Sequence, residues 1–430
     1  MLRLSRGTAE PGTPLAMPSL ARHTGSMGKT ATKGRKGARG AKPRHEPRSL
    51  TVDGNRLTLL PEGPMRLEAL ITLIDGARHS LRLLYYTYLG DASGKLVREA
   101  LLRAIDRKVT VALLIDGFGS SATPNDYFAE LSRAGAKVCR FNPSYGRRYL
   151  LRNHQKLALA DGDTKSGRAL IGGFNIGDDY FSAAEPRMWR DIGLIIEGPA
   201  AARMAPYFDK LIAWALSPKP KLRTLRQMVH HYSESRGALQ WQLGGPTPRL
   251  SPWGVSTCRD LVHSRDVAII AAYFAPTWGL LKRIARVGNR GRARVITAAK
   301  SDNTATIAAA RFTYNRLIKR GVEVYEYSPT KLHTKLVVLD NVVHIGSSNL
   351  DIRSLYLNME LMLRIDSAKF AQLMRDYFEG EAANSLAITP QLQKKRATLL
   401  NRIRWAISFF LVTSLDYGVT RRLNFGLIDG

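Results

Sequence analysis

Residues 154–161 read HQKLALAD, and residues 333–340 read HTKLVVLD. Both segments fit the pattern H-x-K-x4-D, and four apolar residues fill the x4 positions in each. A short apolar run of this kind predicts a buried β-strand. Alternate side chains of a strand face the same way, so each His shares a face with its Lys. Each segment therefore predicts an imidazole beside an ammonium group.

A turn that begins with glycine and ends with asparagine follows each segment. Residues 172–175 read GGFN, and residues 346–349 read GSSN. Glycine allows close approach of the backbone to a small anion. Two such copies would gather histidines, lysines and amides around one phosphodiester and stabilise its developing charge. The predicted phosphate-binding residues are Gly173, Asn175, Ser347 and Asn349.

The repetition is what gives the pattern weight. One H-x-K on a strand is usually an ordinary half-exposed pair, but two copies with the same downstream turn are very improbable by chance. Each Asp lies at an odd offset of seven from its His. We therefore expect the two aspartates to hold the turn after the strand rather than to touch phosphate. The six motif residues form the predicted catalytic set: His154, Lys156, Asp161, His333, Lys335 and Asp340.

Strands and helices alternate on both sides of the motifs. Strands are expected at 81–88, 109–115 and 136–141, and again at 267–274, 293–298 and 322–327; helices are expected at 94–106, 125–134, 279–287 and 307–319. This order predicts an α/β fold whose sheets are covered by helices. Its recurrence predicts two homologous halves. We place the first domain at 55–215, a proline-rich connection at 216–252 and the second domain at 253–390.

Composition limits the function classes. With 430 residues and 44% hydrophobic side chains, the chain has ample core for two domains. The net charge of +30 favours polyanionic partners, either nucleic acid or an anionic membrane. Cys139 and Cys258 have no metal-binding spacing, so we expect two reduced, packed thiols. No metal or cofactor is predicted.

Both ends of the chain are basic. Residues 1–48 hold eleven Lys or Arg and two Glu, a composition typical of disorder. This tail could be a passive tail, an electrostatic tether or a transit peptide, and Met27 could be the true start. Residues 391–430 mix basic and aromatic residues, which suits either an interfacial helix or a core-packed one. No apolar run reaches the about 20 residues of a membrane span, and no secretory signal is recognised.

These features together resemble the paired HKD motifs of the phospholipase D superfamily over residues 55–390. Within it the chain is most similar to bacterial cardiolipin synthases, on the stretch 346–361 (GSSNLDIRSLYLNMEL), on 273–276 (YFAP), on 325–327 (YEY) and on 189–191 (WRD) with 197–198 (EG). The resemblance implies two α/β/α sandwich halves with the active site at their interface. The chain differs from those enzymes in one respect. Many of them carry two N-terminal membrane helices, and this chain has a basic tail instead.

The resemblance also implies a mechanism. One motif histidine attacks phosphorus and forms a phosphohistidine, while the other serves as acid and then base. The family's usual order assigns His154 as nucleophile and His333 as acid/base. It further implies Asp191 as the partner that orients His154 and Glu360 as the partner of His333.

The predicted activity is transfer of a phosphatidyl group to phosphatidylglycerol. Lipid hydrolysis and a nuclease or phosphodiesterase activity remain alternatives, and a non-catalytic scaffold is disfavoured because every motif residue is intact. The implied partners are anionic phospholipids and the membrane surface, with nucleic acid less favoured. One chain carries both motifs, so a monomer suffices. We expect peripheral attachment to the cytoplasmic face of a bacterial inner membrane.

Overall fold

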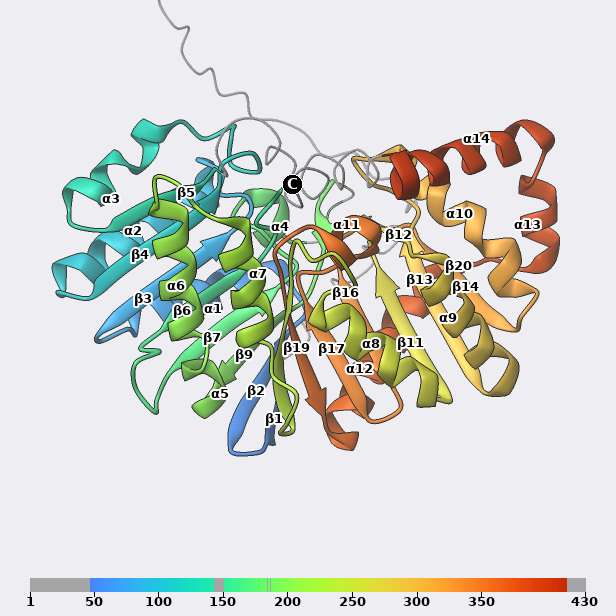
Figure 1. Ribbon diagram of the computed structural model, residues 1–430, viewed down its shortest axis with the longest axis horizontal. Helices are drawn as coiled ribbons and strands as arrows, with labels where there is room; N and C mark the ends of the chain where they lie inside the picture. The colour runs from blue at the N-terminus through green and yellow to red at the C-terminus, as the bar shows by residue number, and fades with distance from the viewer. Residues whose placement is uncertain (1–46, 143–150, 184, 186, 416–430) are drawn as a thin grey trace, which may run out of the picture. The chain divides into compact units, whose positions relative to one another are not determined.

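The computed structural model describes residues 47–142, 151–183, 185 and 187–415, which all belong to one compact unit. The predictions for the basic tail and Met27 fall outside the described residues, apart from the last two positions of the tail. Each half of the described chain contains one eight-stranded mixed sheet with helices on its faces (Figure 1). The predicted α/β class with two halves is confirmed.

The first sheet has the strand order β1-β2-β9-β7-β6-β3-β4-β5. Its strands are β1 (Arg48–Val52), β2 (Asn55–Leu60), β3 (Ser80–Tyr85), β4 (Thr110–Asp116), β5 (Lys137–Phe141), β6 (Leu157–Ala160), β7 (Arg168–Gly172) and β9 (Gly193–Glu197). Its helices are α1 (Gly63–Asp75), α2 (Ala92–Asp106), η1 (Asn125–Phe128), α3 (Ala129–Arg133), α4 (Asp178–Phe181), α5 (Pro199–Ala202), α6 (Ala205–Leu216) and α7 (Leu222–His231).

The second sheet has the strand order β10-β19-β17-β16-β11-β13-β14-β20. Its strands are β10 (Leu239–Gly244), β11 (Asp266–Ala271), β13 (Arg292–Ala298), β14 (Val322–Tyr327), β16 (Lys335–Leu339), β17 (Val342–Gly346), β19 (Glu360–Asp366) and β20 (Ser385–Ala387). Its helices are α8 (Pro252–His263), α9 (Trp278–Arg290), α10 (Thr304–Ile318), α11 (Ile352–Tyr356), α12 (Ala368–Ala383), α13 (Pro390–Arg396), α14 (Leu399–Phe410) and the π-helical turn η2 (Leu411–Leu415).

Six strands of each sheet follow the same path. The order β9-β7-β6-β3-β4-β5 in the first half corresponds to β19-β17-β16-β11-β13-β14 in the second. Each pair of neighbours has the same direction in both halves: the three strands at one end run parallel, and the remaining pairs are antiparallel. The internal repeat is therefore a repeat of topology.

The motif strands lie in the middle of the sheets because they are apolar on both faces. Every residue of β6 (LALA) and of β16 (KLVVL) is buried. Helices must cover both faces of such strands, and this gives each half its layered form. Cys139 and Cys258 are free, buried thiols within these layers.

The segment 216–252 differs from the predicted connection. It contains α7 and the strand β10, which pairs antiparallel with β19 along its whole length, from Leu239 opposite Ile365 to Gly244 opposite Glu360. All six residues of β10 are buried, Trp241 among them. The five prolines of the segment flank these elements rather than interrupt them. β10, a strand of the second sheet, therefore lies before residue 253, the predicted start of the second domain.

One hydrophobic core joins the two halves. It contains Leu157 and Leu194 from the first sheet together with Leu336, Leu361 and Leu363 from the second. Short strands also connect the halves: β8 (Trp189–Arg190) pairs parallel with β15 (Lys331–Leu332). A further two-stranded pair, β12 (Phe274–Ala275) with β18 (Leu350–Asp351), lies within the second half. Among the described residues, no helix has both the length and the apolarity to cross a bilayer.

Candidate active site

The two motif histidines stand just ahead of the central strands β6 and β16. Lys156 Nζ donates to the backbone oxygen of His154 at 2.6 Å, and Lys335 Nζ donates in the same way to the backbone oxygen of His333. Both lysines are buried, with exposed fractions of 1% and 2%. Each half thus supplies one His–Lys pair in which a buried lysine donates to the backbone oxygen of its histidine.

Each histidine is held by a carboxylate from the opposite half. His154 Nδ1 lies 3.1 Å from Glu360 Oε2, and His333 Nδ1 lies 2.6 Å from Asp191 Oδ2. The prediction that Asp191 orients His154 and that Glu360 orients His333 is therefore wrong. The two carboxylates are histidine partners, but the pairs are exchanged between the halves.

Two short backbone pairings cause the exchange. In the pairing of β8 with β15, Leu332 lies opposite Arg190, and His333 N donates to Arg190 O at 2.8 Å. Asp191 follows Arg190 directly and so lies beside His333. At the other contact an isolated bridge joins Asn153 to Met359.

This second contact places Glu360 in the same way. His154 N donates to Met359 O at 2.9 Å, so Glu360, the next residue, lies beside His154. The local sequence contains no signal for a pairing of only one or two residues between segments so far apart. Only the three-dimensional arrangement of the halves could show which acid serves which histidine.

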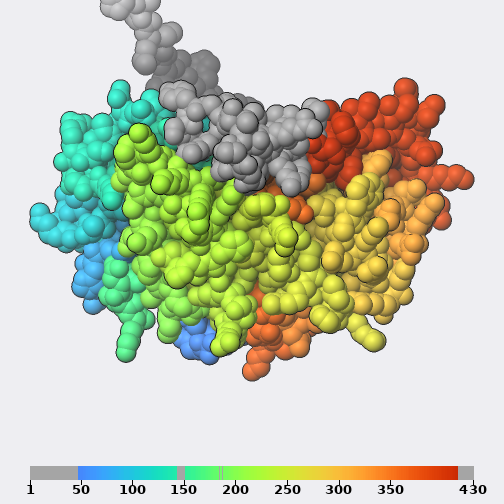
Figure 2. All heavy atoms as spheres, in the orientation of Figure 1, coloured from blue at the N-terminus to red at the C-terminus, as the bar shows by residue number. Residues whose placement is uncertain are grey.

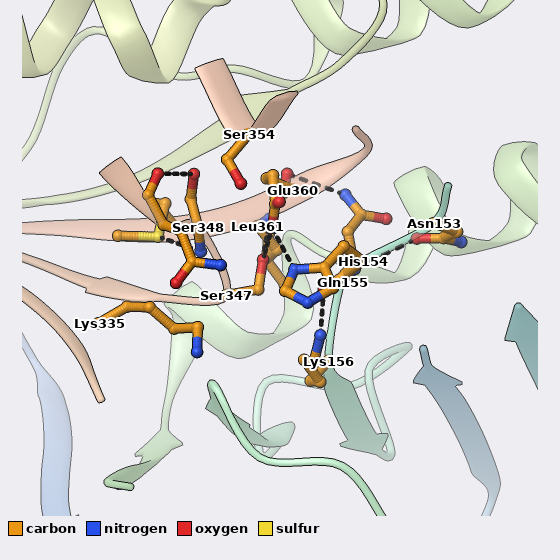
Figure 3. A network of polar contacts seen from close by, with 12 residues as sticks. Asn153, His154, Gln155, Lys156, Lys335, Ser347, Ser348, Ser354, Glu360 and Leu361 are labelled. Atoms are coloured by element: carbon orange, nitrogen blue, oxygen red, sulfur yellow. Dashed lines mark hydrogen bonds and ion pairs between the residues drawn. The ribbon is translucent and has the colours of Figure 1, made fainter. Parts of the chain in front are cut away.

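Holding each ring at Nδ1 leaves Nε2 as the nitrogen for chemistry. Figure 3 shows His154 between Glu360 and Lys156, with Lys335 of the other half pointing toward the same space. Aromatic side chains, which sequence reasoning missed, pack edge-on against the imidazoles. The ring of Tyr86 lies 5.0 Å from that of His154.

His333 has two such neighbours. The ring of Tyr180 lies 5.3 Å from the imidazole, and that of Trp189 lies 5.2 Å away. These rings limit rotation of the histidine and exclude water from its sides.

Burial sets the protonation of these groups. It lowers the pKa of both His154 and His333, and the charge of Lys335 lowers that of His333 further. Burial opposes ionisation of Asp191, but its pairing with His333, including their hydrogen bond, and the charge of Lys335 bring the pKa of Asp191 below its ordinary value. Burial also lowers the pKa of Lys335 to about 8. At neutral pH both imidazoles are therefore neutral, and Lys335 keeps its charge.

Ser347 supports a carboxylate instead of facing open space. Its Oγ donates to Glu360 Oε2 at 2.5 Å and accepts from Leu361 N at 2.9 Å (Figure 3). Gly173 is the corresponding residue of the first half. A Cβ on Gly173 would lie 2.7 Å from Asp191 Oδ2 and 2.8 Å from Lys335 Cδ. These two residues, predicted to bind phosphate, are placed by the structure against the carboxylates that hold the histidines.

The two asparagines differ in their contacts. Asn175 Oδ1 accepts from Thr87 N at 3.1 Å, and its Nδ2 donates to the Tyr180 hydroxyl at 3.0 Å. Asn349 is also buried, but its Oδ1 has no hydrogen-bond partner within the described part of the chain. Phosphate binding by either amide remains a prediction.

The motif aspartates lie away from the histidines, at the far ends of the strands. Asp161 accepts from the backbone N–H groups of Arg78, His79 and Ser80 at 2.7–3.1 Å. Asp340 accepts from those of Arg265 and Asp266 at 2.8–3.2 Å.

Both residues adopt the left-handed region, with φ of 52° and 48°, where Asp is tolerated better than most residues. They hold the turn after the strand, which is the structural task that the sequence predicted.

A further buried acid was not predicted. Asp116, at the end of β4, accepts from Asn153 N at 2.7 Å and from Phe118 N and Gly119 N. It therefore fixes the backbone immediately before His154. Among the described residues, no group of three or more His, Cys, Asp or Glu side chains is arranged to hold a metal ion.

Two imidazoles, each oriented by a carboxylate, and two buried lysines are the groups that the two-histidine chemistry of the phospholipase D class uses. The family model described as "Cardiolipin synthase, PLD-like domain" matches residues 70–212 and 258–381. The chain belongs to this family.

Similar proteins agree with that membership. Cardiolipin synthase A of Pseudomonas aeruginosa is 30% identical over 354 residues, which cover 80% of this chain and 70% of the relative. Cardiolipin synthase 1 of Bacillus cereus is 28% identical over 363 residues, with the same two coverages. The solved structure of phosphatidylserine synthase from Haemophilus influenzae Rd KW20 shares the fold, with a TM-score of 0.67 at 14% identity over 87% of this chain and 96% of that one.

Proposed function

We propose that this enzyme transfers a phosphatidyl group from a phospholipid donor to the hydroxyl of phosphatidylglycerol, giving cardiolipin through a covalent phosphohistidine. The observation that carries the proposal is the pair of imidazoles, each held at Nδ1 by a carboxylate of the other half. The names of the similar proteins support cardiolipin as the product.

The chemistry divides into two displacements. In the first, His154 Nε2 attacks phosphorus; a P–N bond forms, the P–O bond to the leaving alcohol breaks, and protonated His333 gives that alcohol its proton. In the second, His333 takes the proton of the incoming hydroxyl, whose oxygen attacks phosphorus as the P–N bond breaks. The roles of the two histidines follow the family's usual order.

The other groups stabilise the changing charges. Lys156 and Lys335 lie beside the histidines, where they would balance the negative oxygens of the transition state. Glu360 and Asp191 would stabilise whichever imidazole becomes positive. Burial keeps His333 neutral at neutral pH, so we expect the bound phosphodiester anion to supply the charge that favours its protonation.

Attachment to the membrane is part of the same proposal. The substrates are lipids, and the charge of +30 favours an anionic surface. We therefore place the enzyme peripherally on the cytoplasmic face of a bacterial inner membrane. Both motifs and both carboxylates come from one chain, so a monomer holds a complete site.

Purified enzyme mixed with phosphatidylglycerol vesicles, followed by lipid mass spectrometry, tests the proposal. Cardiolipin and glycerol are the expected products. Phosphatidic acid in place of cardiolipin would identify water as the acceptor and make the enzyme a hydrolase. Cleavage of nucleic acid with no lipid product would contradict a lipid substrate altogether.

A further inference from the structure

A second site lies outside the catalytic machinery, in an open groove of about 770 Å³ formed by α10, α13 and α14. Both α13 and α14 follow Glu381, the last residue matched by the family model. None of the residues that line the groove is a motif residue or a histidine partner. Its volume falls in the range of about 300–1,000 Å³ that is usual for small-ligand sites.

The groove is strongly cationic. Its lining includes Arg316, Lys319, Arg320 and Arg402, all exposed, and no carboxylate. A fifth cation, Arg311, is already held by Glu326 at 2.8 Å. Within the described chain, none of the four exposed cations forms an ion pair. The groove therefore presents uncompensated positive charge.

The cations share the groove with aromatic and apolar side chains. The guanidinium of Arg316 lies 5.3 Å from the centre of the Trp278 ring, and Trp278 is 48% exposed. Trp405 is buried in the groove wall, and its indole nitrogen has no hydrogen-bond partner among the described residues. A ligand with both negative and apolar parts would meet both kinds of lining.

Helix α14 explains how such a ligand could extend out of the groove. Its inner face packs on α10, with the ring of Phe409 4.8 Å from that of Phe312. Its outer face leaves Leu400, Ile403 and Ile407 exposed by 81%, 49% and 54%.

Phe410, exposed by 56%, continues this row. The spacing of three, four and three residues puts the four side chains on one side of the helix. Ile403 also lines the groove, so the apolar row and the cationic lining are continuous. Figure 2 shows α13 and α14 at the surface of the second half, in red.

We infer that this groove binds an anionic phospholipid of the membrane, with its phosphate among Arg316, Lys319 and Arg402 and its acyl chain along the outer face of α14. Basic residues beside an exposed apolar row are what an anionic bilayer attracts. A neutral apolar partner would leave the cations unmatched, and a soluble polyanion would leave the apolar row in water. The inference rests on the proposed function for its lipid context, but the site is separate from the chemistry.

The test compares full-length variants in flotation with phosphatidylcholine vesicles, with or without phosphatidylglycerol. The charge variant is Lys319→Glu/Arg402→Glu, and the apolar variant is Ile403→Ser/Ile407→Ser. Both change exposed side chains, so the fold should persist. We expect each to weaken binding to the anionic vesicles by about tenfold or more.

Matched controls separate this site from the general charge of the protein. Lys210→Glu/Arg223→Glu makes the same charge change on α6 and α7, and Val262→Ser removes an exposed apolar side chain from α8. These variants should bind as the wild type does. Activity toward a short-chain phosphatidylglycerol dispersed below its micelle concentration should stay unchanged in all of them.

Several outcomes would overturn the inference. Groove variants that bind anionic vesicles like the wild type would refute it, as would an equal loss in the charge control. Groove variants that change only the oligomeric state would identify a second copy as the occupant. Displacement from vesicles by millimolar inorganic phosphate alone would indicate a soluble-anion site. If the wild type binds vesicles through this groove but makes no cardiolipin, the proposed function fails and the lipid site stands.

Discussion

His154 Nδ1 lies 3.1 Å from Glu360 Oε2, although 206 residues separate the two in sequence and they belong to different halves. The reciprocal pair, His333 with Asp191, closes at 2.6 Å. Neither half therefore contains a complete histidine–carboxylate unit. A mechanism that needs both histidines in defined orientations depends on the junction between the halves as well as on each motif.

The crossed pairing predicts which histidine ring changes when each carboxylate is replaced. Glu360→Gln should alter the tautomer balance of His154 and leave His333 unchanged, because Glu360 contacts the first ring alone. Asp191→Asn should do the reverse. NMR of the protein with isotope-labelled histidine, assigned with His→Ala variants, reports both rings. Each substitution should also lower kcat by about 100-fold or more. A response of His333 to Glu360→Gln would contradict the pairing.

Both histidines should be indispensable. We expect His154→Ala and His333→Ala each to lower kcat by at least about 1,000-fold, because residues that act as one unit lose nearly the whole effect when either is removed. Circular dichroism and the melting temperature should show a retained fold. A variant that keeps a tenth or more of the wild-type rate would defeat the two-histidine mechanism.

Gly173 should be intolerant of a methyl group. In Gly173→Ala the new Cβ would come within 2.7 Å of Asp191 Oδ2, so the carboxylate or Lys335 must move and kcat should fall. Overpacking of this kind costs about 1–3 kcal/mol of stability. The matched control is Gly380→Ala in α12, where nothing lies within 4 Å of the added Cβ and alanine should stabilise the helix by about 0.5–1 kcal/mol. Activity assays and denaturation midpoints of the two variants measure these effects.

Asp161 should matter for stability more than for chemistry. Asp161→Asn keeps one acceptor for the backbone N–H groups of Arg78, His79 and Ser80 but loses the charge, and we expect a loss of about 1–3 kcal/mol in the free energy of unfolding. Burial opposes ionisation of Asp161, yet these hydrogen bonds lower its pKa. The stabilisation is thus present above the unfolded pKa and is lost as pH falls through the folded one. Denaturation at several pH values should show the two proteins converging in acid; a large drop in kcat with unchanged stability would contradict this role.

The pH dependence of kcat/KM should reveal the titration of Lys335. Burial lowers its pKa to about 8, although the charges of Asp191 and Glu360 act in the other direction. Its charge is therefore present below about pH 8 and is lost as pH rises through that value. Because kcat/KM reports groups of the free enzyme, kcat/KM should fall above about pH 8. Lys335→Arg, if active, should move this limb upward, since a guanidinium stays charged. A wild-type profile that stays flat to about pH 10 would contradict the assignment.

The sequence was sufficient for the features that depend on local pattern. The apolar runs after Lys156 and Lys335 predicted the central strands, and the odd offset of Asp161 and Asp340 predicted their structural task. The strand β10 was missed because proline-rich flanks suggested a linker, whereas Trp241 and its neighbours are buried by pairing with a distant strand.

The partner of each histidine was missed for a similar reason. Both carboxylates were identified, but their assignment depends on the pairing of β8 with β15 and on the bridge from Asn153 to Met359. These contacts involve one or two residues from each half. Side-chain periodicity carries no information about them, so only the assembled halves reveal the exchange.

The most direct test of the account is to trap the covalent intermediate. Enzyme mixed with a phosphatidyl donor labelled in its phosphatidyl group and quenched within milliseconds should carry the label on the peptide that contains His154. The adduct should be labile in acid and stable in mild base, as a P–N bond requires, and it should persist longer in His333→Ala if any forms there. Label on the His333 peptide would reverse the two roles. Rapid turnover with no adduct on either peptide would contradict covalent catalysis.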